Sequence, residues 1–157
     1  ETLESVVVRA LIERKLTLAL AESCTGGLIA HRVTNVPGSS ETFLAGIVAY
    51  SNQAKTDFLD APEDLIAGHG AVSPEVAEAM ANGAAARTGA DIALGVTGIA
   101  GPGGGTPEKP VGLVYIGMRT PEGTSVTKHV FGGSRTEIKL RASQAALNLV
   151  RTYLLSI

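Results

Sequence analysis

The sequence predicts an α/β fold, a three-layer α/β/α sandwich with a mixed, mostly parallel sheet of about five strands. Helical segments alternate with short apolar runs up to Val96, which is typical of strands paired in parallel. Two alternating segments then follow each other as a hairpin, and a long helical pattern closes the chain. With 157 residues, 45% of them hydrophobic, the chain is expected to form one domain over residues 1–157.

The first third of the chain predicts a helix, a strand, a second helix and a second strand. Apolar residues at helical steps indicate a helix over Leu3–Arg14. The period of two in Leu16, Leu18 and Leu20 indicates a strand leading to Ser23, and a helix over Leu28–Val33 is then stopped by Val36-Pro37-Gly38. The continuous apolar run Phe43–Ala49 suits a strand that is covered on both faces.

The middle of the chain predicts three helices. Asn52–Leu59 forms a short one, and a brief turn of helix begins at Ala61-Pro62-Glu63-Asp64 and ends before Gly68. Ser73-Pro74-Glu75 combines a capping side chain, a proline in the first turn and a favourable charge. These residues predict the start of a helix that ends at Gly89.

The last part of the chain predicts a buried strand, a hairpin and a long helix. The strand Asp91–Val96 leads into the glycine-rich segment Thr97–Pro107. Val111–Met118 and Thr124–Phe131 are expected to form the antiparallel hairpin. From Ser134 onward a stripe of apolar residues predicts an amphipathic helix, namely Ile138, Ala142, Ala145, Leu149 and Tyr153.

Composition excludes several classes of protein. Thirteen basic and fifteen acidic residues give a net charge of −2 without a basic cluster, so nucleic acid is not expected as a partner. The one cysteine, Cys24, excludes an internal disulfide and a cysteine-built zinc site, and no metal is expected. The absence of an export signal or a long apolar span predicts a cytoplasmic protein with no membrane partner.

Ser23 lies between the first predicted strand and the glycines Gly26 and Gly27. A helix that begins there offers unpaired amides and a positive dipole end, which favour an attacking oxygen or a bound phosphate. The alternative is a capping turn without chemistry. Cys24 is a rival nucleophile, because a thiol at a helix start can be acidified, although lone cysteines commonly serve as packing groups.

The glycine-rich segment after the third predicted strand can either hold phosphate or act as a structural crossover. Missing side chains let amides approach oxygen atoms, but neither G-x-x-x-x-G-K-[ST] nor G-x-G-x-x-G is present. If the first and third strands are neighbours, the Ser23 turn and this segment open to one crevice, where such folds bind ligands.

A serine nucleophile needs a base. His31, His69 and His129 lie in no convincing motif, and G-x-S-x-G is absent. Lys55 is the candidate base if burial lowers its pKa, with Tyr50 able to relay or orient a proton, although an exposed lysine is the simpler alternative. Near the final helix, Arg135 and Arg141 are candidate anion-binding residues, or solvated side chains.

Five ordered motifs resemble the CinA carboxy-terminal domain family over nearly the whole chain. They are Ala21-Glu22-Ser23-Cys24-Thr25-Gly26-Gly27, Val36-Pro37-Gly38-Ser39-Ser40, Val48-Ala49-Tyr50-Ser51-Asn52, Gly68-His69-Gly70-Ala71-Val72-Ser73 and the segment Val96–Gly112. The resemblance implies the sandwich fold and an amidohydrolase that converts nicotinamide mononucleotide to nicotinic acid mononucleotide and ammonia. It also implies a stand-alone form without the amino-terminal domain of larger relatives, and no cofactor.

The resemblance implies roles for individual residues. Ser23 is the expected nucleophile, with Tyr50 and Lys55 as activating partners acting directly or in relay. The expected substrate-binding residues are Thr25, Gly26, Gly27, Thr97, Gly98, Ala100, Gly101, Gly103, Gly104 and Arg135. The family commonly reads Phe-Pro-Gly-Asp-Arg before the last helix, whereas this chain has Phe131-Gly132-Gly133-Ser134-Arg135.

A second hypothesis belongs to another class of protein. The chain could be a non-catalytic nucleotide-binding domain, or an assembly domain linked to competence or damage, that retains the fold without turnover. Retention of Ser23, Tyr50 and Lys55 together favours the enzyme, because a degenerate domain has less need of all three. A small-molecule nucleotide partner and a homodimer are expected.

Overall fold

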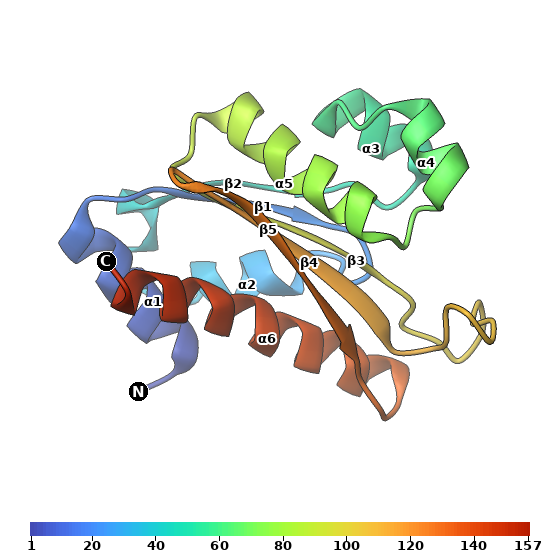
Figure 1. The fold of residues 1–157 in the computed structure, drawn as a ribbon. Helices are drawn as coiled ribbons and strands as arrows, with labels where there is room; N and C mark the ends of the chain where they lie inside the picture. The colour runs from blue at the N-terminus through green and yellow to red at the C-terminus, as the bar shows by residue number, and fades with distance from the viewer.

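A five-stranded sheet divides the protein into three layers (Figure 1), in a computed structural model that describes residues 1–157. The strands are β1 (Leu18–Glu22), β2 (Phe43–Val48), β3 (Ile92–Gly98), β4 (Leu113–Thr120) and β5 (Gly123–Val130). The helices are α1 (Leu3–Arg14), α2 (Leu28–Thr34), α3 (Asn52–Leu59), α4 (Glu63–His69), α5 (Pro74–Thr88) and α6 (Arg135–Leu155), with a 3-10 turn at Ser39–Glu41.

The sheet is mixed, in the order β2-β1-β3-β4-β5. β1 pairs in parallel with both β2 and β3, whereas β4 is antiparallel to both β3 and β5. Only β4 is therefore reversed, which confirms the predicted mostly parallel sheet. Helices α1, α2 and α6 cover one face, and α3, α4 and α5 cover the other (Figure 1).

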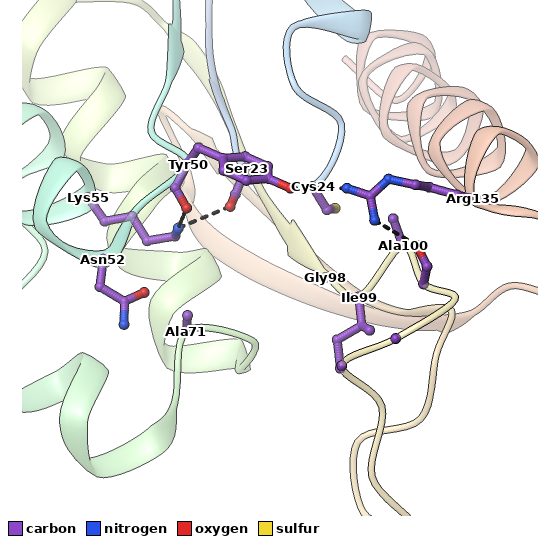
Figure 2. A pocket seen from close by; sticks show the side chains of 13 residues that line it. Ser23, Cys24, Tyr50, Asn52, Lys55, Ala71, Gly98, Ile99, Ala100 and Arg135 are labelled. Atoms are coloured by element: carbon purple, nitrogen blue, oxygen red, sulfur yellow. Dashed lines mark hydrogen bonds between the residues drawn. The ribbon is translucent and has the colours of Figure 1, made fainter.

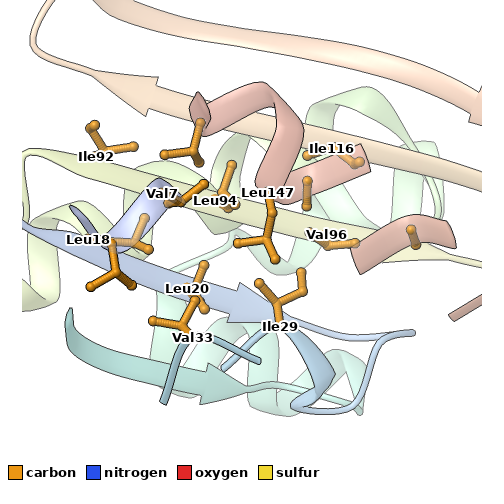
Figure 3. Packing of buried hydrophobic residues seen from close by; sticks show 14 of the residues in the cluster. Val7, Leu18, Leu20, Ile29, Val33, Ile92, Leu94, Val96, Ile116 and Leu147 are labelled. Carbon is orange, nitrogen blue, oxygen red and sulfur yellow. The ribbon is translucent and has the colours of Figure 1, made fainter. Parts of the chain in front are cut away.

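Alternation along β1 supplies both cores. Leu18 and Leu20 pack into the larger cluster on the α6 face, among side chains such as Val7 and Leu147 (Figure 3). Ala19 and its alternating neighbours point to the opposite cluster beneath α5. Full burial of one Leu or Val side chain contributes about 1.5–3 kcal/mol, so these leucines stabilise the α6 layer strongly.

Small residues bring α5 close to the sheet. A Cβ atom on Gly95 in β3 would lie 2.4 Å from the carbonyl oxygen of Ala77 in α5, and one on Gly117 in β4 would lie 2.6 Å from the same oxygen. Real Cβ atoms do not approach backbone oxygen this closely, so both strands need glycine where α5 crosses them.

The predicted helix starts are confirmed at α5 and α6. Ser73 Oγ accepts a hydrogen bond from the Val76 amide at 3.2 Å, with Pro74 in the first turn. Ser134 and Glu137 cap α6 reciprocally, because the side chain of each accepts from the other's backbone amide. The reciprocal cap of Ser134 and Glu137 fixes the start of α6, the helix that carries Arg135.

One prediction about burial is wrong. β2 lies at the edge of the sheet with every second residue exposed, so Phe43–Ala49 is not covered on both faces as expected. β1 and β3 are the strands that are buried on both faces, and both lie inside the sheet. An apolar run indicates burial but not strand order, and strand order decides which strand is central.

The amphipathic helix predicted from Ser134 onward is confirmed as α6, although its apolar residues are buried to different extents. Ile138 and Ala142 are fully buried as expected, whereas Ala145, Leu149 and Tyr153 are only half-buried. The face that meets the core continues instead through Ala146, Leu147, Val150 and Leu154. These half-buried residues still pack against the core cluster, and α1 contacts α6.

The two ends of the chain lie together, away from the glycine-rich loop. Figure 1 shows both termini at the left and the loop that follows β3 at the right. α6 begins beside that loop and runs 21 residues back toward the termini. No helix in residues 1–157 has both the length and the apolar character needed to cross a bilayer.

Candidate active site

The site lies where the three parallel strands end. Glu22, the last residue of β1, pairs with Val48 in β2 and with Val96 in β3. Ser23 follows β1, Tyr50 follows β2, and the glycine-rich loop follows β3. The first and third strands are therefore neighbours, which meets the condition for one shared crevice, and carboxyl ends of parallel strands are where such sheets bind ligands.

Ser23 and Lys55 are in direct contact. Lys55 Nζ lies 3.0 Å from Ser23 Oγ (Figure 2), and the lysine side chain, from the first turns of α3, is only 1% exposed. No carboxylate pairs with the amine, and burial lowers the pKa of Lys55 below its usual 10.5. Lysine is rarely buried without a partner, so this arrangement is typical of a functional group rather than a solvated side chain.

Two carbonyl oxygens orient the amine. Lys55 Nζ donates to the backbone oxygen of Ala49 at 3.0 Å and to that of Tyr50 at 3.1 Å. A neutral amine has two N–H bonds and one lone pair. When the amine is neutral and both N–H bonds point to these carbonyls, its lone pair is left to face Ser23 Oγ and can accept the hydroxyl proton.

Cys24 lines the same pocket but is a poor nucleophile. Its side chain is 6% exposed, and burial raises the pKa of the thiol to about 12. Lys55 counteracts this shift, whereas Glu22 adds to it. The thiol is therefore neutral near pH 7, and thiolate is the reactive form of cysteine.

The start of α2 is occupied by a carboxylate, contrary to the expectation of a free anion site. The buried Glu22 accepts hydrogen bonds from the Ile29 and Ala30 amides, both at 3.0 Å. These are the donors that a helix start would otherwise offer to a ligand. The amide of Cys24, the residue after Ser23, donates to no other protein atom and remains free.

Arg135 lies across the pocket from Lys55 (Figure 2). Its Nη1 donates to the carbonyl oxygen of Gly101 at 2.6 Å, and its Nη2 donates to Tyr50 Oη at 3.1 Å. A guanidinium has five N–H donors, so these two contacts leave others for a ligand. The Tyr50 hydroxyl makes no hydrogen bond to Ser23 or Lys55, which contact each other without it.

These groups line a pocket of about 270 Å³ that is open to solvent. Most of the residues expected to bind substrate or act in catalysis line it, namely Ser23, Tyr50, Lys55, Gly98, Ala100, Gly101, Gly103, Gly104 and Arg135. Thr25, Gly26, Gly27 and Thr97 do not line it. Thr97 instead donates its hydroxyl to the Ala71 carbonyl oxygen at 2.8 Å, and Thr25 is fully buried.

Three lining residues were not among the predicted site residues. Asn52, Ala71 and Ile99 complete the pocket, each within or beside a segment that was already of interest. Asn52 follows Tyr50 closely in sequence and starts α3, so its place at a strand end was a usable indication. Ala71 lies in the motif 68–73 that carries part of the family resemblance, but the loop between α4 and α5 reaches the pocket only through the tertiary fold.

Other candidates from the sequence lie elsewhere. Arg141, in α6, donates to the carbonyl oxygen of Gly132 on the preceding turn and pairs with Glu137 in the same helix at 3.6 Å. None of the three histidines lines the pocket. No group of three or more His, Cys, Asp or Glu side chains is arranged to hold a metal ion.

Fold and site together define an α/β/α domain with a buried serine–lysine pair at the carboxyl ends of parallel strands. The model of the CinA C-terminal domain matches residues 1–154, and the chain belongs to this family. A CinA-like protein of Desulfotalea psychrophila is 57% identical over 155 residues, which are 99% of this chain and 38% of that protein. A CinA-like protein of Geotalea uraniireducens is 54% identical over the whole chain and 37% of its own length.

Solved structures agree with the fold. The competence/damage inducible protein CihA from Agrobacterium tumefaciens is 40% identical, with a TM-score of 0.90 over 98% of this chain and 96% of that one. A CinA superfamily protein from Klebsiella pneumoniae is 31% identical, with a TM-score of 0.95 over 99% and 97%. The chain thus spans under two fifths of the curated relatives named above but nearly all of these two solved chains.

Proposed function

We propose that this domain is a serine–lysine amidohydrolase that deamidates nicotinamide mononucleotide. The contact between the buried Lys55 amine and Ser23 Oγ, 3.0 Å apart, carries the proposal. A depressed lysine pKa is what a general base needs near neutral pH, and the open pocket beside the pair admits a small substrate.

The reaction has two halves. Lys55 takes the Ser23 proton while Oγ attacks the carboxamide carbon, and the Cys24 amide is the donor placed to stabilise the resulting oxyanion. The C–N bond then breaks, and Lys55 passes the proton to the departing nitrogen, which leaves as ammonia. Water cleaves the acyl-serine ester, again with Lys55 as base, giving nicotinic acid mononucleotide and free Ser23.

The glycine-rich loop and Arg135 form the opposite wall, which suits the ribose and phosphate. Gly98, Gly103 and Gly104 expose backbone there, and the unused guanidinium donors of Arg135 can hold a phosphate. In this proposal the reacting amide binds beside Lys55 and the phosphate beside Arg135, two residues that lie across the pocket from each other (Figure 2).

Ammonia and nicotinic acid mononucleotide released by the purified protein test the proposal. Ser23→Ala is expected to abolish release, and Ser156→Ala, a serine at the far end of α6, serves as the matched control. Undiminished release from Ser23→Ala would overturn the assignment of the nucleophile. Loss in Cys24→Ser but not in Ser23→Ala would transfer that role to Cys24.

A non-catalytic binding or assembly domain is the second candidate, favoured by the names of solved relatives, which speak of competence and damage and of no reaction. It predicts that nucleotide raises the melting temperature of the protein while no product forms at any enzyme concentration. Homodimer formation and a cytoplasmic location remain predictions.

A further inference from the structure

We infer that Tyr50 is a substrate-positioning residue: its hydroxyl holds Arg135 in place to receive the anionic end of the substrate, and it is not a proton relay to Ser23. The inference rests on the proposed function, because it assigns one residue a part in binding the nucleotide phosphate. Three observations about Tyr50 carry it.

First, the proton path does not need the phenol. Lys55 Nζ already lies 3.0 Å from Ser23 Oγ, and its other contacts are the backbone oxygens of Ala49 and Tyr50. Figure 2 shows the Tyr50 ring directed across the pocket toward Arg135, with its hydroxyl at the end away from the lysine amine. A relay would require the hydroxyl to lie between the two reacting groups.

Second, the hydroxyl is engaged with Arg135. Tyr50 Oη accepts from Arg135 Nη2 at 3.1 Å, while Nη1 of the same guanidinium donates to the Gly101 carbonyl oxygen at 2.6 Å. The two acceptors lie on separate segments, after β2 and after β3, and together they fix the plane of the guanidinium. No carboxylate pairs with Arg135, so its positive charge stays available to an anion.

Third, the backbone of Tyr50 also contacts the catalytic pair. Its carbonyl oxygen accepts from Lys55 Nζ at 3.1 Å, so one residue touches the base through its main chain and the anion anchor through its side chain. The distance between the attacking oxygen and the anchor is therefore set in part by Tyr50. Such a connection selects substrates whose amide and phosphate are separated by the matching length.

The hydrogen bond between Arg135 and the Gly101 carbonyl oxygen depends on close packing of Gly101 against Val111. Gly101 has φ +78°, and a Cβ atom there would lie 2.4 Å from Val111 Cγ1. The loop can thus present its carbonyl to Arg135 only with glycine at this position. The hydroxyl oxygen of Tyr50 is the second acceptor, and substitution by phenylalanine removes it without moving the backbone.

Tyr50→Phe tests the inference, because it removes the hydroxyl and keeps the ring. We expect the KM for nicotinamide mononucleotide to rise about tenfold, in line with a lost hydrogen bond to a charged group, while kcat and its pH profile stay within about twofold. Tyr153→Phe, on the distant half of α6, is the matched control. For nicotinamide riboside, which lacks the phosphate, the ratio of variant to wild-type KM is expected to be much smaller.

A fall in kcat at unchanged KM, or a shifted pH profile, would make Tyr50 a proton relay and overturn the inference. An equal loss for the riboside would overturn it as well, because the phosphate would then be irrelevant. Binding of nicotinic acid mononucleotide to Ser23→Ala, with and without Tyr50→Phe, separates this result from the proposed function. If the wild-type protein binds the nucleotide but turns over nothing, the amidase proposal fails, and a binding loss of about tenfold still supports the role of Tyr50.

Discussion

Replacement of Lys55 by methionine tests both the chemistry and the electrostatics of the buried amine. Methionine fills most of the lysine volume without an ionisable group, so packing in this part of α3 is retained. Ser23 loses the amine at 3.0 Å, and loss of a positioned base lowers rates by about 10²–10⁴-fold. We therefore expect kcat for amide hydrolysis to fall by about a thousandfold, with a small change in KM.

The stability of the two proteins should also depend differently on pH. Burial lowers the pKa of Lys55 in the folded state, whereas the unfolded chain keeps a value near 10.5. Between these two pKa values the unfolded state binds more protons, so the free energy of unfolding of the wild type rises with pH across that window. Below the folded pKa the full penalty of a buried ammonium applies, about 1.4 kcal/mol for each pKa unit of depression.

The Lys55→Met variant would carry no such penalty, but the Ala49 and Tyr50 carbonyl oxygens would lose their donor at any pH. The test is therefore the slope and not the absolute difference. Urea unfolding from pH 7 to 10.5 is expected to show the wild type gaining stability relative to Lys55→Met as the pH rises. Lys128→Met, a substitution in β5 away from the pocket, serves as the control and should run parallel to the wild type.

Two outcomes would refute this reasoning. Parallel stability curves for wild type and Lys55→Met would mean that the pKa of the amine is not depressed by burial. Retained ammonia release would mean that another group takes the Ser23 proton. The wild-type kcat/KM should itself rise with pH as the free enzyme loses the Lys55 proton, and reach its plateau below pH 10.5.

Two further substitutions have defined outcomes. Glu22→Gln replaces one of the two carboxylate oxygens that accept hydrogen bonds at the start of α2 with an NH₂ group, which then faces a backbone N–H. It should lower the free energy of unfolding, measured by urea denaturation, by about 1–3 kcal/mol. An unchanged midpoint would contradict the capping role of Glu22. Gly95→Ala forces a Cβ atom to 2.4 Å from the Ala77 carbonyl oxygen and should lower the free energy of unfolding, measured by thermal denaturation, by about 1–3 kcal/mol or more. The same change at the exposed Gly103 is the control and should leave stability unchanged.

Most helices and strands could be predicted from the sequence because capping residues, turns and apolar periodicity act within a few neighbouring residues. The Ser73-Pro74-Glu75 start of α5 is such a case, since the cap, the proline and the charge all act within one turn. The period of two in Leu16, Leu18 and Leu20 likewise predicted the strand that leads to Ser23. Its central place in the sheet was not predictable, because pairing with β2 and β3 is decided by segments far away in the chain.

The candidate site was also predictable only in part. Ser23 and Lys55 could be singled out from a strand end and a residue type, and the sequence also allowed a helix start free to bind anions. That expectation failed because the buried Glu22 caps the helix itself. The bond between Tyr50 and Arg135 joins residues 85 positions apart, and no local pattern reports such a contact.

The position of the termini has a consequence for how this domain is used. Both ends emerge at the side of the sheet remote from the pocket, and the 21 residues of α6 separate Arg135 from the last turn by roughly 30 Å. Additional polypeptide can be attached at either end without shielding the mouth of the pocket. The fold is thus suited to fusion, and a domain of this shape can be carried by proteins of very different length with the entrance to its pocket open.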